Sequence, residues 1–249
     1  MEPIKLPQTV SHLLSIRRAE TGLQAPLVMA FAEDTGWLNE LAAQFLGPIE
    51  AAYFSTLRSE RRRKSYLLGR YAAKLALRDP LAEPDPKCIE IVRGVFEQPI
   101  VHFGRTGGWG VTISHSDSLA VCLAFPVGHP MGVDVERIEE ARQKTILSQL
   151  SREEISLVEG AAANRQRVAT ALWAAKEALS KVLTTGLMTP FQVYNLAEFS
   201  QIDSRIWEGL FQNFAQYKVR VWAGSTFVLS LAMPKRSVLE QTADLSVFL

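Results

Sequence analysis

The feature that most constrains the fold is an internal repeat in which a helix is followed by an apolar strand. Residues 71–77 read YAAKLAL, and residues 173–179, which begin 102 positions later, read WAAKEAL. Residues 119–126 read LAVCLAFP, and residues 227–234, which begin 108 positions later, read FVLSLAMP. Alanine-rich helices and apolar strands can match by coincidence, but both pairs occur in the same order. The repeat therefore favours two structurally similar halves.

We expect an α+β fold built as a pseudo-dimer of two similar α+β halves, with boundaries at residues 1–126 and 127–249. At 249 residues the chain is long enough for one large domain or two small ones. Because clefts between domains are preferred ligand sites, we expect the active site in the cleft between the halves.

The composition is that of an ordinary soluble protein, with 47% hydrophobic and 21% charged residues. A net charge of +1 argues against nucleic acid or a charged membrane as partner. Cys88 and Cys122 lie in apolar runs, so we interpret them as buried free thiols in a reducing compartment. With no apolar stretch of membrane-spanning length and no signal-peptide core, we expect a cytoplasmic protein.

Two acidic segments carry the candidate chemistry. Residues 132–136 read GVDVE and predict a strand whose Asp134 and Glu136 share one face. Trp173, Glu177 and Lys181 are spaced four residues apart and share one face of a helix. If the two faces meet, three carboxylates lie beside a lysine, and such hard oxygen ligands favour Mg²⁺. The alternatives are solvated strand ends and an ordinary ion pair along the helix.

Other polar groups allow more than one interpretation. His115 follows Ser114 at the end of a predicted strand, but no nucleophile elbow supports a serine protease. A basic cluster on one predicted helix can be a solvated face or bind phosphate, and comprises Arg58, Arg61, Arg62, Arg63, Lys64 and Arg70. The glycine-rich residues 104–108 lack a Walker lysine and indicate a turn.

In combination, these motifs resemble the Sfp-type 4′-phosphopantetheinyl transferases. The family signatures are a Ser-His strand end, a Gly-Val-Asp-Val-Glu strand and a Trp-x-x-Lys-Glu helix, and this chain has similar residues in that order over roughly residues 55–235. The resemblance implies the pseudo-dimeric 4′-phosphopantetheinyl transferase fold. It also implies Mg²⁺-dependent transfer of 4′-phosphopantetheine from coenzyme A to a serine of an apo carrier protein, with release of adenosine 3′,5′-bisphosphate.

The resemblance also implies residue roles. The implied metal ligands are Asp134, Glu136 and Glu177. Glu177 would act as general base, with Lys181 neutralising pyrophosphate charge, and Asp134 would join them as a catalytic residue. The implied coenzyme A contacts are Arg63, Arg70, Ser114, His115, Lys176 and Lys181. Because the first copy of the repeat has Leu75 in place of Glu177, we expect one active site per chain.

The chain departs from the family at one turn. A Gly-Lys-Pro or Gly-Arg-Pro turn is common in the family, whereas Gln98 precedes Pro99 here and carries no charge. Arg93 or Arg105 could substitute for the missing cation.

Two rival functions remain open at this point. One is a Mg²⁺-dependent phosphohydrolase acting on a nucleotide-like pyrophosphate, and the other is a non-catalytic coenzyme A-binding protein. For the transferase we expect a monomer that modifies acyl, peptidyl or polyketide carriers of fatty acid, polyketide or nonribosomal peptide synthesis.

Several local expectations concern the elements around the site. We expect irregular structure over residues 1–33 with a short strand at 26–31, and one long helix over 55–78. Residues 137–150 are interpreted either as a solvated linker or as a carrier-docking patch that includes Arg142 and Lys144. The last fifteen residues are predicted to be a poorly packed tail.

Overall fold

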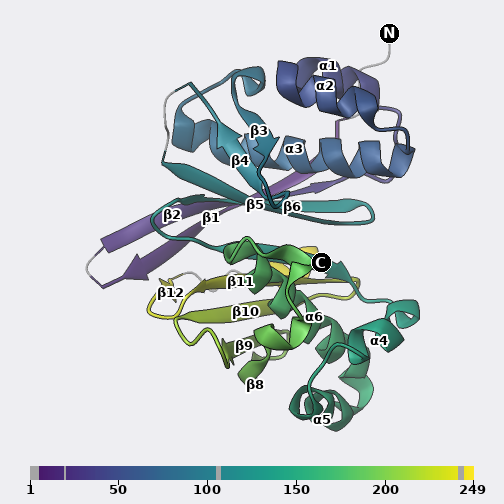
Figure 1. The fold of residues 1–249 in the computed structure, drawn as a ribbon, viewed down its shortest axis with the longest axis vertical. Helices are drawn as coiled ribbons and strands as arrows, with labels where there is room; N and C mark the ends of the chain where they lie inside the picture. The colour runs from purple at the N-terminus through teal and green to yellow at the C-terminus, as the bar shows by residue number, and fades with distance from the viewer. Residues whose placement is uncertain (1–5, 20, 105–107, 241–243) are drawn as a thin grey trace. The chain divides into compact units, whose positions relative to one another are not determined.

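The computed structural model describes residues 6–19, 21–104, 108–240 and 244–249 as a mixed α/β fold with antiparallel sheets (Figure 1). The chain folds into two compact units. Unit 1 comprises Met1–Ser15 and Leu23–Gly128, and unit 2 comprises Ile16–Gly22 and His129–Leu249. No helix among the described residues is both long enough and apolar enough to cross a bilayer.

Unit 1 consists of a sheet, a long helix and a small hairpin. The strands of its sheet are hydrogen-bonded in the order β1-β2-β6-β5, and β12 pairs with β1 at the edge. The helix α3 packs on β5 and β6 (Figure 1). Its strands are β3 (Glu90–Arg93), β4 (Pro99–His102), β5 (Trp109–Ser116), β6 (Leu119–Pro126) and most of β1 (Gln8–Arg18) and β2 (Thr21–Phe31), whose residues within Ile16–Gly22 belong to unit 2. Its helices are α1 (Leu38–Phe45), α2 (Pro48–Thr56) and α3 (Glu60–Leu81), with a 3₁₀ turn η1 at Pro86–Cys88.

Unit 2 repeats this plan with a five-stranded sheet in the order β7-β11-β10-β9-β8 and the helix α6 packed on β7, β10 and β11. Its strands are β7 (Gly132–Arg137), β8 (Leu196–Asp203), β9 (Ile206–Phe211), β10 (Tyr217–Ala223), β11 (Phe227–Pro234) and β12 (Val238–Leu239). Its helices are α4 (Glu140–Leu147), α5 (Arg152–Gly160) and α6 (Arg165–Val182). Its 3₁₀ turns are η2 (Ala162–Asn164), η3 (Gly186–Met188), η4 (Phe191–Tyr194) and η5 (Leu245–Phe248).

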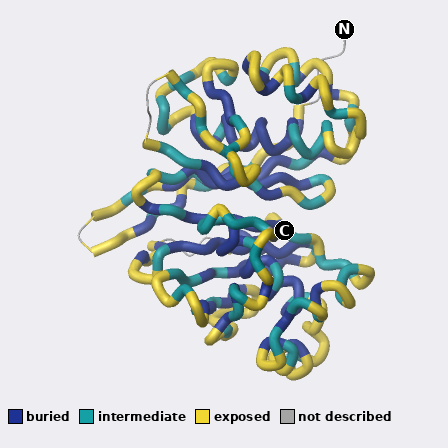
Figure 2. Tube along the Cα trace, viewed as in Figure 1, coloured by how far each residue is buried: buried dark blue, intermediate teal, exposed yellow. Residues whose placement is uncertain are grey.

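The middle of the central helix of each unit is buried, as the dark segments of Figure 2 show. In α3 and α6 the small side chains of Ala72, Ala73, Ala174 and Ala175 are fully buried. Alanine favours a helix and allows its backbone to approach the sheet closely. The two AAK segments of the repeat therefore form corresponding helices, each lying on the sheet of its own unit.

A buried ion pair is built in the same way in both units. In unit 1, Lys74 Nζ lies 2.5 Å from Glu50 Oε2, and both side chains are at most 1% exposed. In unit 2, Lys176 Nζ lies 2.6 Å from Glu154 Oε2, again with both side chains at most 1% exposed. Each lysine is the lysine of its AAK segment.

Both glutamates also hold backbone groups. Glu50 Oε2 accepts from the amide of Gly47, just before α2, and Glu154 Oε2 accepts from that of Ser151, just before α5. The other oxygen of each carboxylate accepts a strand amide: Ile91 N donates to Glu50 and Leu196 N donates to Glu154, each at 3.0 Å. One carboxylate thus ties together the central helix, a short helix and a strand, and the structural likeness of the two units extends to individual atoms.

The amino-terminal expectation is wrong. Residues 1–5 and 20 lie outside the described part of the chain, but β1 and β2 each run for 11 residues. The burial of β1 alternates, with Leu14 and Ile16 buried, but its residue types hide that alternation because the apolar Leu13 is exposed. Pairing with β6 stabilises β2 as a strand.

The long helix expected over residues 55–78 is α3, but it begins only at Glu60 and ends at Leu81, and residues 55 and 56 belong to α2. Helix α2 begins at Pro48, because proline suits the first turn, where no intrahelical amide partner is needed. Pro80 lies inside α3, which ends at Leu81. A proline near the end removes few hydrogen bonds and does not stop the helix immediately.

Other expectations are corrected in unit 2 and at one cysteine. Helix α4 occupies most of residues 137–150, for which the sequence left a linker and a docking patch as alternatives. The tail is packed, since Leu245 is fully buried and the carbonyl oxygen of Leu249 accepts two backbone amides. Cys122 is buried as expected, but Cys88 is exposed.

Candidate active site

The acidic face of β7 meets one face of α6, as the spacing of the two segments predicts. Trp173 Nε1 donates a 3.0 Å hydrogen bond to Glu136 Oε1. Two helical turns further along, Lys181 Nζ donates to Asp134 Oδ1 at 2.8 Å. Strand alternation and the four-residue helical repeat therefore place both carboxylates of β7 against α6.

A glycine allows this close approach. A Cβ atom at Gly132 would overlap the carbonyl oxygen of Ala178 on α6. The obstruction is backbone, which cannot move aside as a flexible side-chain end can. The glycine of the GVDVE segment is thus required by the packing of β7 on α6.

Gly132→Ala is accordingly expected to destabilise unit 2 by about 1–3 kcal/mol, the usual range for overpacking. Urea unfolding monitored by circular dichroism measures this change. Gly128→Ala is a suitable control, because no atom lies within 4 Å of a Cβ built there. Equal stabilities of the two variants would contradict the proposed backbone contact.

Glu177 completes a cluster of three acidic side chains. The pKa of Glu177 is raised to about 7. Burial is the largest cause, and the negative charges of Asp134 and Glu136 raise the pKa further. Burial and Asp134 likewise raise the pKa of Glu136. These carboxylates are close enough to disfavour one another's ionisation, a situation that a bound cation relieves.

The donor chemistry of this cluster fits Mg²⁺. Asp134, Glu136 and Glu177 supply only hard carboxylate oxygens, the ligands Mg²⁺ prefers. Within the described ranges, however, no group of three or more His, Cys, Asp or Glu side chains is arranged so that it could hold a metal. Protein cations bind two of the carboxylates instead: Lys181 pairs with Asp134, and Arg142 pairs with Glu136.

Arg142 was not predicted to take part in this site. It lies on α4, and its two terminal nitrogens bind the two oxygens of Glu136, with NH2 3.3 Å from Oε1. The residue was interpreted as part of a linker or docking patch, and the sequence pattern contains no signal that α4 would return it to β7.

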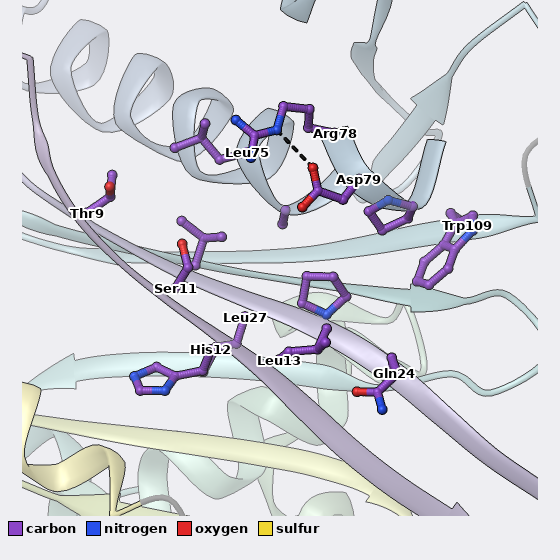
Figure 3. A pocket seen from close by; sticks show the side chains of 14 residues that line it. Thr9, Ser11, His12, Leu13, Gln24, Leu27, Leu75, Arg78, Asp79 and Trp109 are labelled. Carbon is purple, nitrogen blue, oxygen red and sulfur yellow. Dashed lines mark hydrogen bonds and ion pairs between the residues drawn. The ribbon is translucent and has the colours of Figure 1, made fainter. Parts of the chain in front are cut away.

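Among the residues of unit 1 that the structure describes, no acidic cluster lies at the corresponding place. When β6 is aligned with β11 by the 108-residue offset, Val28 takes the register position of Asp134. The 102-residue helix offset places Leu75 at the position of Glu177. Both residues line a cavity of about 590 Å³ (Figure 3). Its apolar walls comprise Leu13, Pro26, Leu27, Val28, Leu75, Pro80 and Trp109. These substitutions support the expectation of one carboxylate site per chain.

A second cavity in unit 1 is rich in cations, with a volume of about 470 Å³. Its charged and aromatic lining consists of Arg62, Arg70, Arg93, Glu97, Tyr53, Tyr66 and His115. Arg93 pairs with Glu97, the single carboxylate of the lining. Three guanidinium groups against one carboxylate form a site suited to phosphate.

Aromatic rings hold two of these arginines. The guanidinium of Arg70 lies 4.5 Å from the centre of the Tyr66 ring, and its Nε is 3.6 Å from Glu50 Oε1. Arg93 stacks 4.7 Å from the Tyr53 ring centre and donates to the Tyr53 hydroxyl at 2.6 Å. Stacked guanidinium groups are ordered before a ligand arrives, which lowers the entropic cost of binding.

The structure brings only some of the predicted coenzyme A residues to this cavity. Arg70 and His115 line it, and Ser114 is buried next to His115 on β5. Arg63 is not among the lining residues; it stacks over Phe54 and donates to Asn39 Oδ1 at 2.8 Å.

Arg93 is one of the two expected substitutes for the missing turn cation, and it does line the cavity. Gln98 instead accepts from the amide of Phe96 within its own hairpin. Arg105, the other substitute, and the turn expected at residues 104–108 include positions outside the described residues.

Lys176 is placed differently from the other signature residues. Its ammonium is inaccessible, and besides Glu154 it donates to Asn195 Oδ1 at 2.8 Å and to the Gln149 carbonyl at 3.4 Å. All three ammonium protons therefore have partners within unit 2, and these contacts of Lys176 are structural.

Comparisons with known proteins agree with this arrangement. Residues 130–232 match the family model described as the 4′-phosphopantetheinyl transferase superfamily. No relative among curated proteins matches the chain. The crystal structure of a holo-ACP synthase from Plasmodium yoelii is 17% identical and aligns over 46% of this chain and 94% of that chain; its TM-score of 0.31 is too low to support an argument.

The matched residues contain the complete acidic cluster, both elements that carry it and the glycine at their contact. Residues 130–232 of this chain are therefore similar to the 4′-phosphopantetheinyl transferase superfamily.

Proposed function

We propose that this chain transfers 4′-phosphopantetheine from coenzyme A to a serine of an apo carrier protein in a Mg²⁺-dependent reaction. The observation that carries the proposal is the partly buried cluster of three carboxylates and one lysine within the residues that match the family model. The protein is expected to act as a cytoplasmic monomer without nucleic acid or membrane. Acyl, peptidyl and polyketide carriers are the candidate acceptors.

The cluster can divide the chemical tasks among its residues. Asp134, Glu136 and Glu177 would hold Mg²⁺, which stabilises negative charge on a leaving phosphate when bound. Glu177 accepts the proton of the carrier serine, and its pKa of about 7 suits a base working near neutral pH. Lys181 supplies a positive charge next to Asp134, where it can neutralise phosphate oxygens.

In this reaction the serine oxygen forms a bond to the phosphorus that carries pantetheine. The bond from that phosphorus to the bridging pyrophosphate oxygen breaks, and adenosine 3′,5′-bisphosphate leaves with the bond's electron pair. The serine proton moves to Glu177, so charge and atoms balance without any oxidant or reductant.

The arginine cavity of unit 1 is the proposed site for the 3′-phosphate of coenzyme A. Arg70 and His115 keep the role expected from the sequence, and Arg62 and Arg93 join them as lining residues. Arg93 thus replaces the cation that Gln98 does not supply. Tyr53 and Tyr66 add aromatic surface beside the guanidinium groups.

Intact-mass spectrometry of purified apo carriers tests the activity directly. Incubation with the enzyme, coenzyme A and Mg²⁺ should add the mass of one phosphopantetheine group to the carrier, and a carrier whose acceptor serine is alanine should gain none. Formation of adenosine 3′,5′-bisphosphate without carrier would instead identify a phosphohydrolase. Coenzyme A binding without either product would identify a binding protein.

Arg70→Lys and His115→Ala are expected to raise the KM for coenzyme A more than they lower kcat, because the 3′-phosphate does not react. Arg70→Lys retains a positive charge near Glu50 but loses the stacked, forked guanidinium. Steady-state kinetics with saturating carrier measure the two constants separately.

The matched control is Arg63→Lys on the same helix, since Arg63 contacts Phe54 and Asn39 rather than the cavity. Dephospho-coenzyme A, which lacks the 3′-phosphate, should be used almost equally by the wild type and by Arg70→Lys. A defect of the same size with both substrates would refute the 3′-phosphate assignment.

A further inference from the structure

Glu136 accepts hydrogen bonds from two side chains through both of its carboxylate oxygens. Oε1 accepts from Trp173 Nε1 at 3.0 Å and from Arg142 NH2 at 3.3 Å, and Oε2 accepts from Arg142 NH1. These bonds use three of the roughly four lone-pair sites of the carboxylate, so a metal ion that binds through both oxygens requires one of these partners to move.

The two partners differ in how readily they can move. The Trp173 ring is stacked on Phe191 with ring centres 4.5 Å apart, which fixes the indole in the core of unit 2. The Arg142 side chain is 38% exposed and extends from the eight-residue helix α4. Arg142 can therefore turn toward solvent, whereas Trp173 cannot move without losing its contact with Phe191.

Charge also favours the departure of Arg142. The cluster contains the carboxylates of Asp134, Glu136 and Glu177 together with the cations Lys181 and Arg142, a formal charge of −1 when all are ionised. With all five side chains in place, a bound divalent ion would bring the formal charge of the cluster to +1. If the Arg142 guanidinium moves away, the same ion brings the formal charge to zero.

We infer that Arg142 is an internal counter-cation, which occupies Glu136 when no metal is bound and competes with the divalent ion for that carboxylate. The inference rests on the proposed function, in which the cluster binds Mg²⁺. Trp173 remains bonded to Glu136 in both states and keeps the carboxylate pointing toward the cluster. Arg142 thus sets the metal affinity of the site and is a positioning residue, since it acts through Glu136.

The test measures metal binding rather than activity. Mn²⁺ serves as the probe because it takes the same oxygen ligands as Mg²⁺, and electron paramagnetic resonance reports its free concentration during a titration. Arg142→Gln removes the competing charge and is expected to lower the Kd for Mn²⁺ on the order of tenfold, as Coulomb's law suggests for a unit charge within a few ångströms.

Two matched variants separate this effect from general changes in charge and folding. Lys144→Gln removes a charge from the exposed side of the same helix and should leave the Kd unchanged. Arg142→Lys keeps the charge and should bind Mn²⁺ more weakly than Arg142→Gln. Circular dichroism of each variant checks that unit 2 remains folded.

The outcomes distinguish the inference from the function on which it rests. Tighter binding by Arg142→Gln alone supports competition. If the wild type binds Mn²⁺ but Arg142→Gln binds it equally or more weakly, Arg142 does not compete and the inference is overturned. If neither the wild type nor Arg142→Gln binds Mn²⁺ with or without coenzyme A, the metal assignment of the proposed function is itself overturned.

Discussion

Glu177→Gln is expected to reduce phosphopantetheine transfer by roughly 10²- to 10⁴-fold, the usual contribution of a general base. The amide has nearly the same shape as the carboxylate but cannot accept the serine proton, and it is a poorer metal ligand. The measurement is kcat at saturating coenzyme A, carrier and Mg²⁺, followed by the mass of the carrier.

The fold should tolerate this change. Burial and the neighbouring Asp134 raise the pKa of Glu177, which means that a charge at this position is penalised and a neutral side chain is not. Glu159→Gln, at an exposed position of α5, is the control and should transfer at the wild-type rate. A kcat within about twofold of wild type for Glu177→Gln would exclude Glu177 as the base, since even the low end of the general-base range is larger.

Lys176→Met is expected to lower the free energy of unfolding by about 3–5 kcal/mol, because it leaves the Glu154 carboxylate buried without its cation. Typical domains have a free energy of unfolding of only about 5–15 kcal/mol, so this loss would be a large part of the stability of unit 2. Chemical unfolding followed by tryptophan fluorescence measures the loss.

A double variant distinguishes the missing charge partner from lost packing. Lys176→Met combined with Glu154→Gln has no unpaired buried charge, and the glutamine oxygen can still accept the amide of Leu196. The double variant should therefore be more stable than Lys176→Met alone. Lys144→Met, on an exposed face, should change stability by no more than about 0.5 kcal/mol.

The same substitution at the corresponding lysine of unit 1, Lys74→Met, should have a similar effect, because Glu50 would lose its cation in the same way. If Lys176→Met proves as stable as wild type but raises the KM for coenzyme A, the lysine contacts the ligand after all. That result would restore the role implied by the family resemblance.

The acidic cluster was predictable from local periodicity. Strand alternation places Asp134 and Glu136 together, and a four-residue spacing places Trp173, Glu177 and Lys181 together. The roles assigned to these side chains remain predictions, but their meeting depends only on two regular elements that pack face to face.

Long-range contacts explain where the sequence was insufficient. The 11-residue strand β2 is stabilised by pairing with β6, some ninety residues later, so its own pattern contains little signal. The packed chain end likewise depends on backbone hydrogen bonds from Thr226 and Phe227 to Leu249. Such pairings are properties of two distant segments, and neither segment reveals them alone.

By itself, the sequence determined the order of the repeated elements, the two faces of the acidic cluster and the loss of that cluster in unit 1, because each follows from the spacing of neighbouring residues. Only the tertiary structure decided that Lys176 is a buried partner of Glu154 and that Arg142 binds Glu136. Both pairs join side chains from different elements, and a lysine or arginine carries the same charge in the sequence whether it meets a ligand, a carboxylate or solvent. The burial of the side chain and its distances to neighbouring groups show which of these partners it has, and both are set only when the elements pack.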